Sequence, residues 1–246
     1  MENVFAKGQV HAQRIIATGL PEMSFYFSTP PTSSQRSLEG NVLISGQQND
    51  YYDLLVSETL HLFSVTFQPH GLSAFFELPL SELQNQTVLA DHISKAYSAQ
   101  IADEMGATDS FARRVEIIER HFLKLLAKQT TSVDRQRMAY AVEVIRKAKG
   151  AVSIDYLAAN ACLSRKQFER KFLHYIGISP KQFLKIIRFQ NAIYLKQHRE
   201  GISLTELAYE GGYYDQSHLI NDIKDLTGQT PKKLFGAGGV ISDFFS

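Results

Sequence analysis

A pattern that occurs twice in the C-terminal half most constrains what this 246-residue chain can fold into. The first copy has a short apolar-periodic segment, a tight turn, a longer segment and a Gly-x-Ser-Pro exit, at residues 153–160, 161–163, 164–175 and 177–180. The second copy keeps this order, with Thr in the exit, at residues 203–210, 211–213, 215–226 and 228–231. Such a repeat indicates a repeated supersecondary unit. The predicted unit is a short helix, a turn and a longer helix.

Composition permits a packed core and excludes several classes of protein. Hydrophobic residues make up 44% of the chain and charged residues 21%, which is typical of a globular protein. The single Cys162 excludes an intramolecular disulfide framework and a multi-cysteine metal site, and we predict it as a small buried residue in a turn. The sequence has no apolar run of about 18 residues and no signal-peptide pattern. We therefore expect a cytoplasmic protein with no membrane partner.

Charge divides the chain into two parts. Residues 1–133 hold nine Lys or Arg against fourteen Asp or Glu, a net charge of −5, whereas residues 134–246 hold 17 against 11, a net charge of +6. A basic second part is suited to a polyanionic partner, although chance surface composition gives the same asymmetry.

The first part, residues 1–129, is predicted as a small β-rich module with helices. Strand composition marks residues 23–28 and 41–45, and residues 60–67 alternate apolar and polar side chains. Three strands are few for a closed barrel, so we expect an open sheet or one that a partner chain completes. Helical periodicity predicts four helices in this part. They lie at residues 71–78, from Ser81 onward, at 89–101 and at 108–128. The last of these, capped by Thr108 or Asp109, is a candidate dimerisation helix, although such stripes are more often intramolecular core.

No catalytic constellation stands out in this module, so we expect neither an enzyme nor a cofactor. His61 and His70 lack a third ligand at metal-binding spacing and are predicted as packed or surface histidines. Asp50, Asp53 and Glu58 are interpreted as a solvated loop rather than an acid–base pair. The aromatic residues are either plain core, which is commoner, or the lining of a ligand pocket: Phe25, Tyr26, Phe27, Tyr51, Tyr52, Phe63, Phe67, Phe75 and Phe76.

The longer helix of the first copy has two chemically distinct faces. Phe168, Phe172 and Tyr175 form an apolar stripe, and the opposite face carries Arg165, Lys166, Gln167, Glu169, Arg170 and Lys171. A helix that enters a DNA major groove needs one face to hold it on its domain and long hydrogen-bonding side chains to reach base edges. The alternative is a solvated amphipathic helix in an ordinary bundle.

The segment between the copies has the length that two DNA-reading helices require. Pro180 starts a helix that runs to about residue 199 and spans about 30 Å at 1.5 Å per residue. One turn of DNA is about 34 Å, so the linker can place both helices in successive major grooves. Its Lys181, Lys185 and Arg188, with Lys232 further on, are candidate phosphate contacts or simply solvated.

Residues 134–235 resemble the double helix-turn-helix domain of the AraC/XylS transcription regulators. The strongest similarity lies in Ile202-Ser-Leu-Thr-Glu-Leu-Ala208, Gly211-Gly-Tyr213, Asp215-Gln-Ser-His218 and Gly228-Gln-Thr-Pro231, and the first copy matches through Leu157-Ala158, Leu163-Ser164, Phe168, Arg170, Phe172 and Gly177-Ile-Ser-Pro180. More loosely, the first part resembles the N-terminal modules of one bacterial subgroup of these regulators, through residues 63–71, Phe75-Phe76 and 80–83.

The resemblance implies roles for matching residues. Arg165, Lys166, Gln167, Glu169 and Arg170 fall on the first DNA-reading helix, and Gln216, Ser217, His218 and Asn221 fall on the second. This chain departs from the family at Asn221 and Ile223, where Arg and Phe are usual. Asp215, Asp222 and Asp225 also make the second helix acidic. We therefore expect the first helix to carry most of the affinity, with the second reading weakly or through DNA bending.

The expected fold class is α+β: a β-rich module at 1–129, an all-α double helix-turn-helix domain at 134–235 and a tail at 236–246. The expected function is a bacterial sequence-specific transcription regulator. Candidate partners are double-stranded DNA, RNA polymerase, a small-molecule effector and a second copy of the chain. Activation is the leading expectation, although the sequence does not distinguish it from repression. Two alternatives stay open: a degenerate helix-turn-helix protein that contacts only proteins, and a cupin-like protein that binds small molecules.

Overall fold

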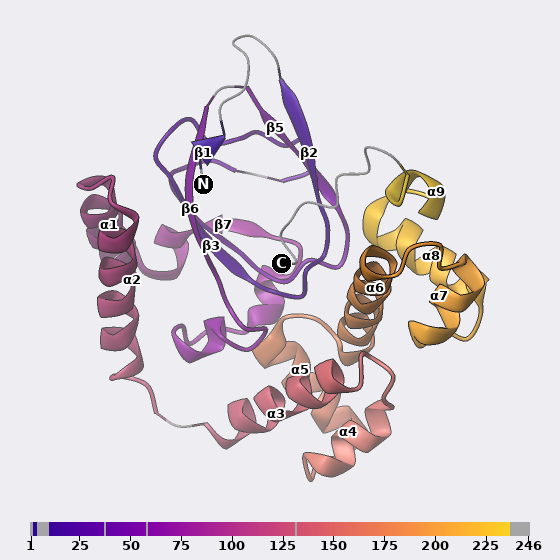
Figure 1. The fold of residues 1–246 in the computed structure, drawn as a ribbon. Coiled ribbons are helices and arrows are strands. Elements are labelled where there is room, and N and C mark those ends of the chain that lie inside the picture. The colour runs from indigo at the N-terminus through magenta and orange to yellow at the C-terminus, as the bar shows by residue number, and fades with distance from the viewer. Residues whose placement is uncertain (1, 4–9, 37, 58, 131, 237–246) are drawn as a thin grey trace.

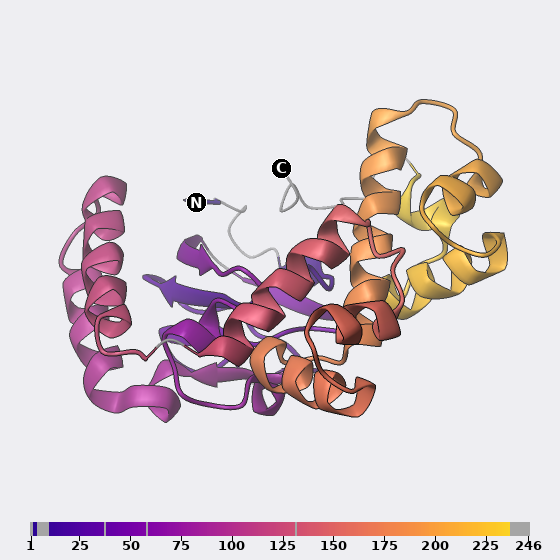
Figure 2. The ribbon, with the colours of Figure 1, turned by 90° about the horizontal axis from the view of Figure 1, so that it is seen from below.

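The computed structural model describes residues 2–3, 10–36, 38–57, 59–130 and 132–236. A β module occupies the middle of the molecule, a pair of helices lies against one side of it, and seven further helices wrap around the other side and one end (Figures 1 and 2). The predicted α+β class, with a β-rich first part and a helical second part, is therefore confirmed.

The β module contains two antiparallel sheets. Five strands follow the order β1-β6-β3-β4-β7, and β2 pairs with β5 as a separate two-stranded sheet. The strands are β1 (Glu2–Asn3), β2 (His11–Ile15), β3 (Glu22–Tyr26), β4 (Val42–Ser45), β5 (Tyr52–Val56), β6 (Leu60–Thr66) and β7 (Thr87–Leu89). The expected open sheet is thus present, and the two-stranded sheet lies across it (Figure 1).

The two faces of the five-stranded sheet differ because side chains alternate along a strand. Met23 and Phe25 on β3 are opposite Val65 and Phe63 on β6, and this face packs on α1 (Ala90–Gly106) and α2 (Phe111–Leu126). The other face carries Glu22, Ser24, Tyr26, Leu43, Ser45 and Thr87 and looks toward β2 and β5. One face is therefore core, and the other is half polar yet enclosed.

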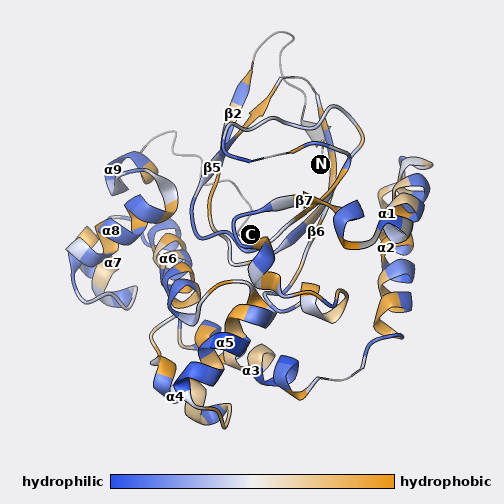
Figure 3. Cartoon of the chain, turned by 180° about the vertical axis from the view of Figure 1, so that it is seen from behind, coloured by the Kyte–Doolittle hydropathy of each residue, from blue (hydrophilic) through white to orange (hydrophobic). Residues whose placement is uncertain are grey.

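The helical half contains α3 (Val133–Lys147), α4 (Ile154–Asn160), α5 (Arg165–Ile176), α6 (Pro180–His198), α7 (Leu204–Glu210), α8 (Gln216–Thr227) and α9 (Pro231–Leu234). Each begins at a residue whose side-chain oxygen accepts a backbone N–H of the first turn, namely Ser132, Ser153, Ser164, Ser179, Ser203, Asp215 and Thr230. One continuous core includes Phe168, Phe172, Phe183 and Phe189, each fully buried. Figure 3 shows how hydrophobic and hydrophilic residues alternate along these helices.

The two copies of the repeat share a turn geometry but differ by one residue. In each turn a backbone amide donates to the carbonyl oxygen five residues earlier. Leu163 donates to Ala158 in the first turn, and Tyr213 donates to Ala208 in the second. The preceding residue is left-handed, Cys162 at φ +54° and Gly212 at φ +79°. The second turn then has an extra residue, Tyr214, which is 89% exposed.

Several predictions about local structure need correction. Cys162 lies in a turn as expected, but it is exposed, because the left-handed turn directs its side chain outward. Asp53 lies in β5 rather than in a loop, and Glu58 lies outside the described residues. The expected helices at 71–78 and from Ser81 are only 3-10 turns at Leu72–Ala74 and Leu80–Leu83. Ser110, not Thr108 or Asp109, caps α2, because its oxygen lies 3.4 Å from the Arg113 amide nitrogen.

The aromatic residues of the β module fall into two groups. Phe25, Phe63, Phe67 and Phe76 are buried in the core against α1 and α2. Tyr26 and Tyr52 instead line a cavity between the two sheets. The core interpretation is therefore confirmed for these phenylalanines, and the ligand-pocket interpretation stays a prediction for the two tyrosines. Among the described helices, none is long and apolar enough to cross a membrane.

Candidate nucleic-acid interface

Helix α5 presents its predicted reading face to solvent. Phe168, Phe172 and Ile176 are fully buried, so the apolar stripe holds the helix on its domain. Lys166 and Arg170 lie one turn apart and are exposed, and neither forms an ion pair with any residue that the structure describes. These two side chains are therefore available to an external partner.

Three other residues of that face are engaged within the domain. Arg165 is 3.2 Å from Asp155 of α4 and 3.2 Å from Glu169 of its own helix. The Gln167 side-chain oxygen accepts bonds from the Ser164 amide and hydroxyl at 3.0 Å, which completes a capping box. The roles predicted for Arg165, Gln167 and Glu169 in DNA reading stay predictions, and the contacts above fix the orientation of α5 relative to α4.

Helix α8 presents a neutral face at the equivalent place. Gln216, Ser217 and Asn221 are exposed, and Gln216 accepts a bond from the Thr205 hydroxyl at 3.2 Å. His218 is half-buried, with its ring edge against Tyr213 and its Nε2 atom 3.7 Å from Asp222. Three of the four residues predicted on this helix are therefore exposed, and His218 is half-buried; their roles in DNA reading stay predictions.

The acidic residues of α8 have partners within the domain. Asp215 is the N-cap, and its carboxylate accepts the His218 amide at 2.7 Å. Asp222 is buried against α6, 3.4 Å from Lys185 and 3.8 Å from Arg188, and Asp225 is 2.7 Å from Lys185. The acidity that we expected to weaken DNA reading is thus paired internally, because α6 supplies the matching cations.

The same ion pairs bear on the predicted phosphate contacts. Lys185 and Arg188 point at α8, and Arg188 also donates to the Gly150 carbonyl at 3.3 Å and lies over the Tyr213 ring. A phosphate would have to share them with Asp222 and Asp225, so they stay predictions that compete with these bonds. Lys181 and Lys232 are exposed near the starts of α6 and α9.

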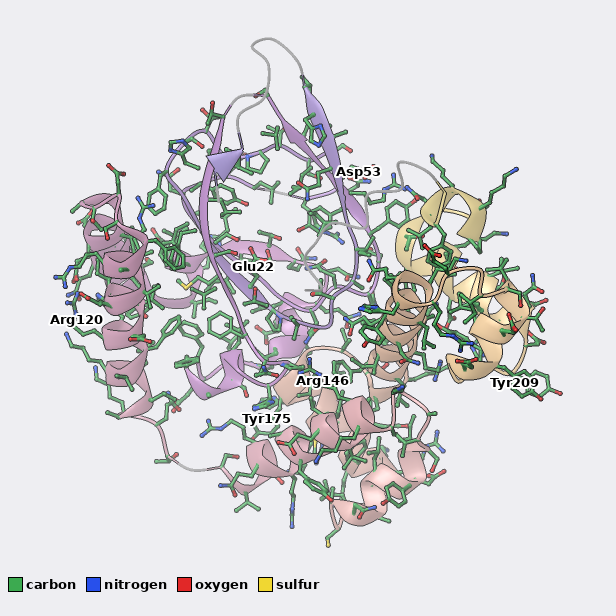
Figure 4. The ribbon with its side chains drawn as sticks, viewed as in Figure 1. Glu22, Asp53, Arg120, Arg146, Tyr175 and Tyr209 are labelled. Carbon is green, nitrogen blue, oxygen red and sulfur yellow. The ribbon has the colours of Figure 1, made fainter. Side chains whose placement is uncertain are left out.

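Two exposed tyrosines beside α8 were absent from the sequence prediction. Tyr209 on α7 is 81% exposed and points into solvent (Figure 4), and Tyr214 precedes the α8 cap. The signal that could have found Tyr214 is the one-residue difference between the two turns.

Both α5 and α8 end against the β module. Gly177 caps α5 at φ +97°, and a Cβ there would lie 2.9 Å from the Leu80 carbonyl oxygen. Gly228 caps α8 at φ +64°, and a Cβ there would overlap the Tyr51 ring. Arg14 adds a bond to the Thr227 carbonyl at 3.1 Å. The module therefore contacts the C-terminal end of each helix and leaves their N-terminal ends open.

Bonds along the rest of the boundary hold the two halves together. Arg146 of α3 donates to the Gln68 side chain at 2.8 Å, and Arg135 donates to the Ser73 carbonyl at 3.1 Å. Gln190 of α6 donates to the Thr18 carbonyl. Arg146 and Tyr175 both lie on the side of the helical half that faces the β module (Figure 4). No group of three or more metal-ligating side chains occurs in the described part of the chain.

Comparisons with known proteins agree with this geometry. Residues 157–237 match a family described as a helix-turn-helix domain, and residues 3–89 match a domain of unknown function. An uncharacterized HTH-type transcriptional regulator of Haemophilus influenzae is 30% identical over 101 residues, which cover 41% of this chain and 33% of that protein. The transcriptional regulator MtrA of Neisseria gonorrhoeae is 30% identical over 106 residues, 42% of this chain and 35% of its own length. The transcriptional activator RhaS of Escherichia coli is 28% identical over 128 residues, which cover 49% of this chain and 45% of that protein.

These curated relatives match over less than half of their own length. The whole fold also has a counterpart among solved structures. ToxT from Vibrio cholerae superposes with a TM-score of 0.53 over 96% of this chain and 97% of its own, at 12% identity. That likeness extends the fold agreement to the β module. Residues 157–237 therefore form a helix-turn-helix domain, and over this half the chain is similar to HTH-type transcription regulators.

Proposed function

We propose that this chain is a bacterial transcription regulator that binds a specific site on double-stranded DNA. Helix α5 and helix α8 enter successive major grooves, and α6 sets the distance between them. The single observation that carries this function is the paired geometry: two helices of the same length, each capped and exposed at its N-terminal end and anchored at its C-terminal end. With 19 residues, α6 spans about 28 Å, close to the roughly 34 Å of a DNA turn.

Helix α5 contributes most of the affinity in this proposal. Lys166 and Arg170 bring positive charge and long donors to base edges and phosphates, whereas the exposed residues of α8 are neutral hydrogen-bonding groups. Tyr209 and Tyr214 pack on the sugar–phosphate backbone beside α8. Because the two helices differ, the preferred DNA site is asymmetric.

The protein has three candidate partners besides DNA. A small molecule in the β module acts as effector by changing how the module contacts the two helix ends. RNA polymerase is the protein partner at a promoter. A second copy of the chain docks through α2, whose Phe111 and Leu123 are 70% and 65% exposed. The protein works in the cytoplasm, where the bacterial genome is.

Selection of binding sites from random DNA, followed by mobility-shift titration, tests this function. We expect an enriched asymmetric site spanning about two helical turns. We also expect affinity to fall steeply with salt, since each phosphate contact releases counterions. Lys166→Ala on α5 should weaken DNA binding. Lys147→Ala on α3 is its matched control, because it also removes one exposed lysine but lies outside the two proposed reading helices. Absence of any shift on genomic fragments at low salt contradicts the proposal.

A further inference from the structure

A cavity of about 140 Å³ lies between the two sheets of the β module. It is walled by the inner face of β3, β4, β6 and β7 on one side and by β2, β5 and the 46–48 segment on the other. Its apolar walls include Ile15, Leu43, Leu54 and Leu62. A cavity of roughly 150 Å³ admits a benzene-sized molecule, so the space is suited to a small ligand.

The polar groups of this cavity have one sign of charge. Glu22 on β3 supplies a carboxyl group, and the described lining residues include no lysine or arginine. The other polar groups are neutral hydroxyls and amides, among them Ser24, Tyr26, Gln48 and Tyr52. Figure 4 shows Glu22 in the interior of the module rather than at its rim. A carboxylate, phosphate or sulfate ligand would therefore meet a like charge and no partner.

Within the described residues, the side-chain partners of Glu22 are hydroxyl groups. The Ser24 hydroxyl donates to it at 2.6 Å, and the Ser64 hydroxyl is a second partner. Burial raises the pKa of the Glu22 carboxyl, and these hydrogen bonds only partly oppose that shift. Burial, together with the nearby Glu22, raises the pKa of Tyr52 to about 12. Glu22 is half-buried. A partly desolvated carboxyl without a cationic partner is stabilised when a ligand brings the missing positive charge.

We propose that the cavity binds a small apolar molecule that carries a protonated primary amine, with the ammonium group on Glu22 and the apolar part between the sheets. The Ser24 hydroxyl and the rings of Tyr26 and Tyr52 complete the ammonium site, because hydroxyl oxygens accept N–H donors and aromatic faces attract cations. The assignment of the ligand class deepens the effector part of the proposed function and rests on it for its regulatory meaning.

The walls of this cavity are also the surfaces that contact the DNA-reading helices. On β2, Gln13 and Ile15 face the cavity, while Arg14 between them bonds Thr227 at the end of α8. In the next wall, Gly46 and Gln48 line the cavity, while Gln47 lies against Gly177 at the end of α5. A ligand that spreads or tightens these walls therefore acts on both helix ends at once.

Calorimetric titration of the full chain without DNA tests the ligand class. The probes are benzylamine, benzyl alcohol and benzoate, which share a ring and differ in the group that meets Glu22. We expect benzylamine to bind at least about tenfold tighter than the other two. We expect Glu22→Gln to remove that preference while it keeps the affinity for benzyl alcohol. Glu82→Gln, the same change at an exposed carboxyl outside the cavity, is the control and leaves the preference intact.

Equal affinity for the three probes, a preference for benzoate, or no binding of benzylamine overturns the proposal. If Glu22→Gln lowers the melting temperature so far that it cannot be titrated, the probe series on the unmodified chain still decides. Binding of benzylamine by a chain that shifts no DNA fragment separates the two proposals: the ligand class then stands and the regulatory function fails. DNA binding without amine binding gives the opposite result.

Discussion

At the scale of single residues, the most informative position is Cys162. It adopts φ +54°, in the left-handed region that disfavours side chains with a Cβ, and the second copy of the turn has Gly212 there. We expect Cys162→Gly to raise the free energy of unfolding by about 0.4–1 kcal/mol, since glycine relieves the strain. Urea denaturation measures it. Cys162→Ala keeps the Cβ and serves as control, and an equal gain for both variants would refute strain as the cause.

Arg170 on α5 carries the sharpest expectation for DNA recognition. We expect Arg170→Ala to weaken binding to a selected site by about 1–3 kcal/mol and to relax base preference at one position. Asn221→Ala on α8 removes an exposed side chain at the matching place and should have a smaller effect, because a neutral amide lacks the attraction to DNA that a guanidinium has. Mobility shifts on single-base variants of the site measure both. The reverse order would show that α8 dominates.

At the scale of elements, α6 and α8 form a clamp through Asp222. The Asp222 carboxylate lies near Lys185, Arg188 and His218, and the side chains of Lys185 and Arg188 are only 23% and 18% exposed. We expect Asp222→Ala to lower the free energy of unfolding by about 1–3 kcal/mol, because it leaves two partly buried cations without their partner. Asp225→Ala should cost less than about 1 kcal/mol, since Asp225 is 66% exposed. Thermal and urea unfolding distinguish the two variants.

Elements that encode their own boundaries could be predicted from the sequence. The helical half follows from local signals: Ser164 and Ser203 with Gln167 and Glu206 make capping boxes, and Pro180 opens α6. Strands β2 and β5 have no such local signal, because His11–Ile15 lacks alternation and its pairing partner lies about forty residues away. Without those strands the sequence offered a ligand pocket only as an alternative and could not locate it between two sheets.

In the candidate site, too, local features could be predicted from the sequence and contacts between distant elements could not. Exposure of Lys166 and Arg170 follows from the helical period, so the sequence alone identifies them. The internal pairing of Asp222 and Asp225 does not follow, because it depends on how α6 crosses α8. For the same reason the sequence could not show that the β module contacts Gly177 and Gly228. Contacts between elements far apart in the chain decide these features.

At the scale of the whole molecule, Gly228 tests the contact between α8 and the β module. An alanine there has a strained φ of +64° and a Cβ that overlaps the Tyr51 ring. Gly201→Ala has the same kind of strain at φ +74° but open space around it, so it is the matched control. We expect Gly228→Ala to lower stability clearly more than Gly201→Ala and to change DNA affinity, which the control should not. Combination with Tyr51→Ala should restore part of the loss.

The ion pair between Arg14 and Asp53 makes this contact sensitive to acid. Two bonds of 2.7 Å join them, and the hydrogen bond from Arg14 lowers the pKa of Asp53 below its ordinary value. Folding then stabilises the ionised carboxylate, so the contribution is complete above the ordinary Asp pKa of about 4 and is lost as the pH falls below it. We expect the destabilisation caused by Asp53→Asn to be largest at neutral pH and to vanish in acid. Urea titrations across pH measure it, and a penalty that grows in acid would contradict the sign.

The covered ends of α5 and α8 limit how this helical half can be fused to the sensor domain of another protein. A chimera that joins this helical half to a foreign sensor would leave two left-handed glycine caps without the groups that now pack on them. A fusion that keeps these contacts therefore has to include the helical half together with Arg14, Gln47, Tyr51 and Leu80. Grafts that carry these four positions should keep both helix ends covered, and grafts cut at the chain boundary between the halves should leave them exposed.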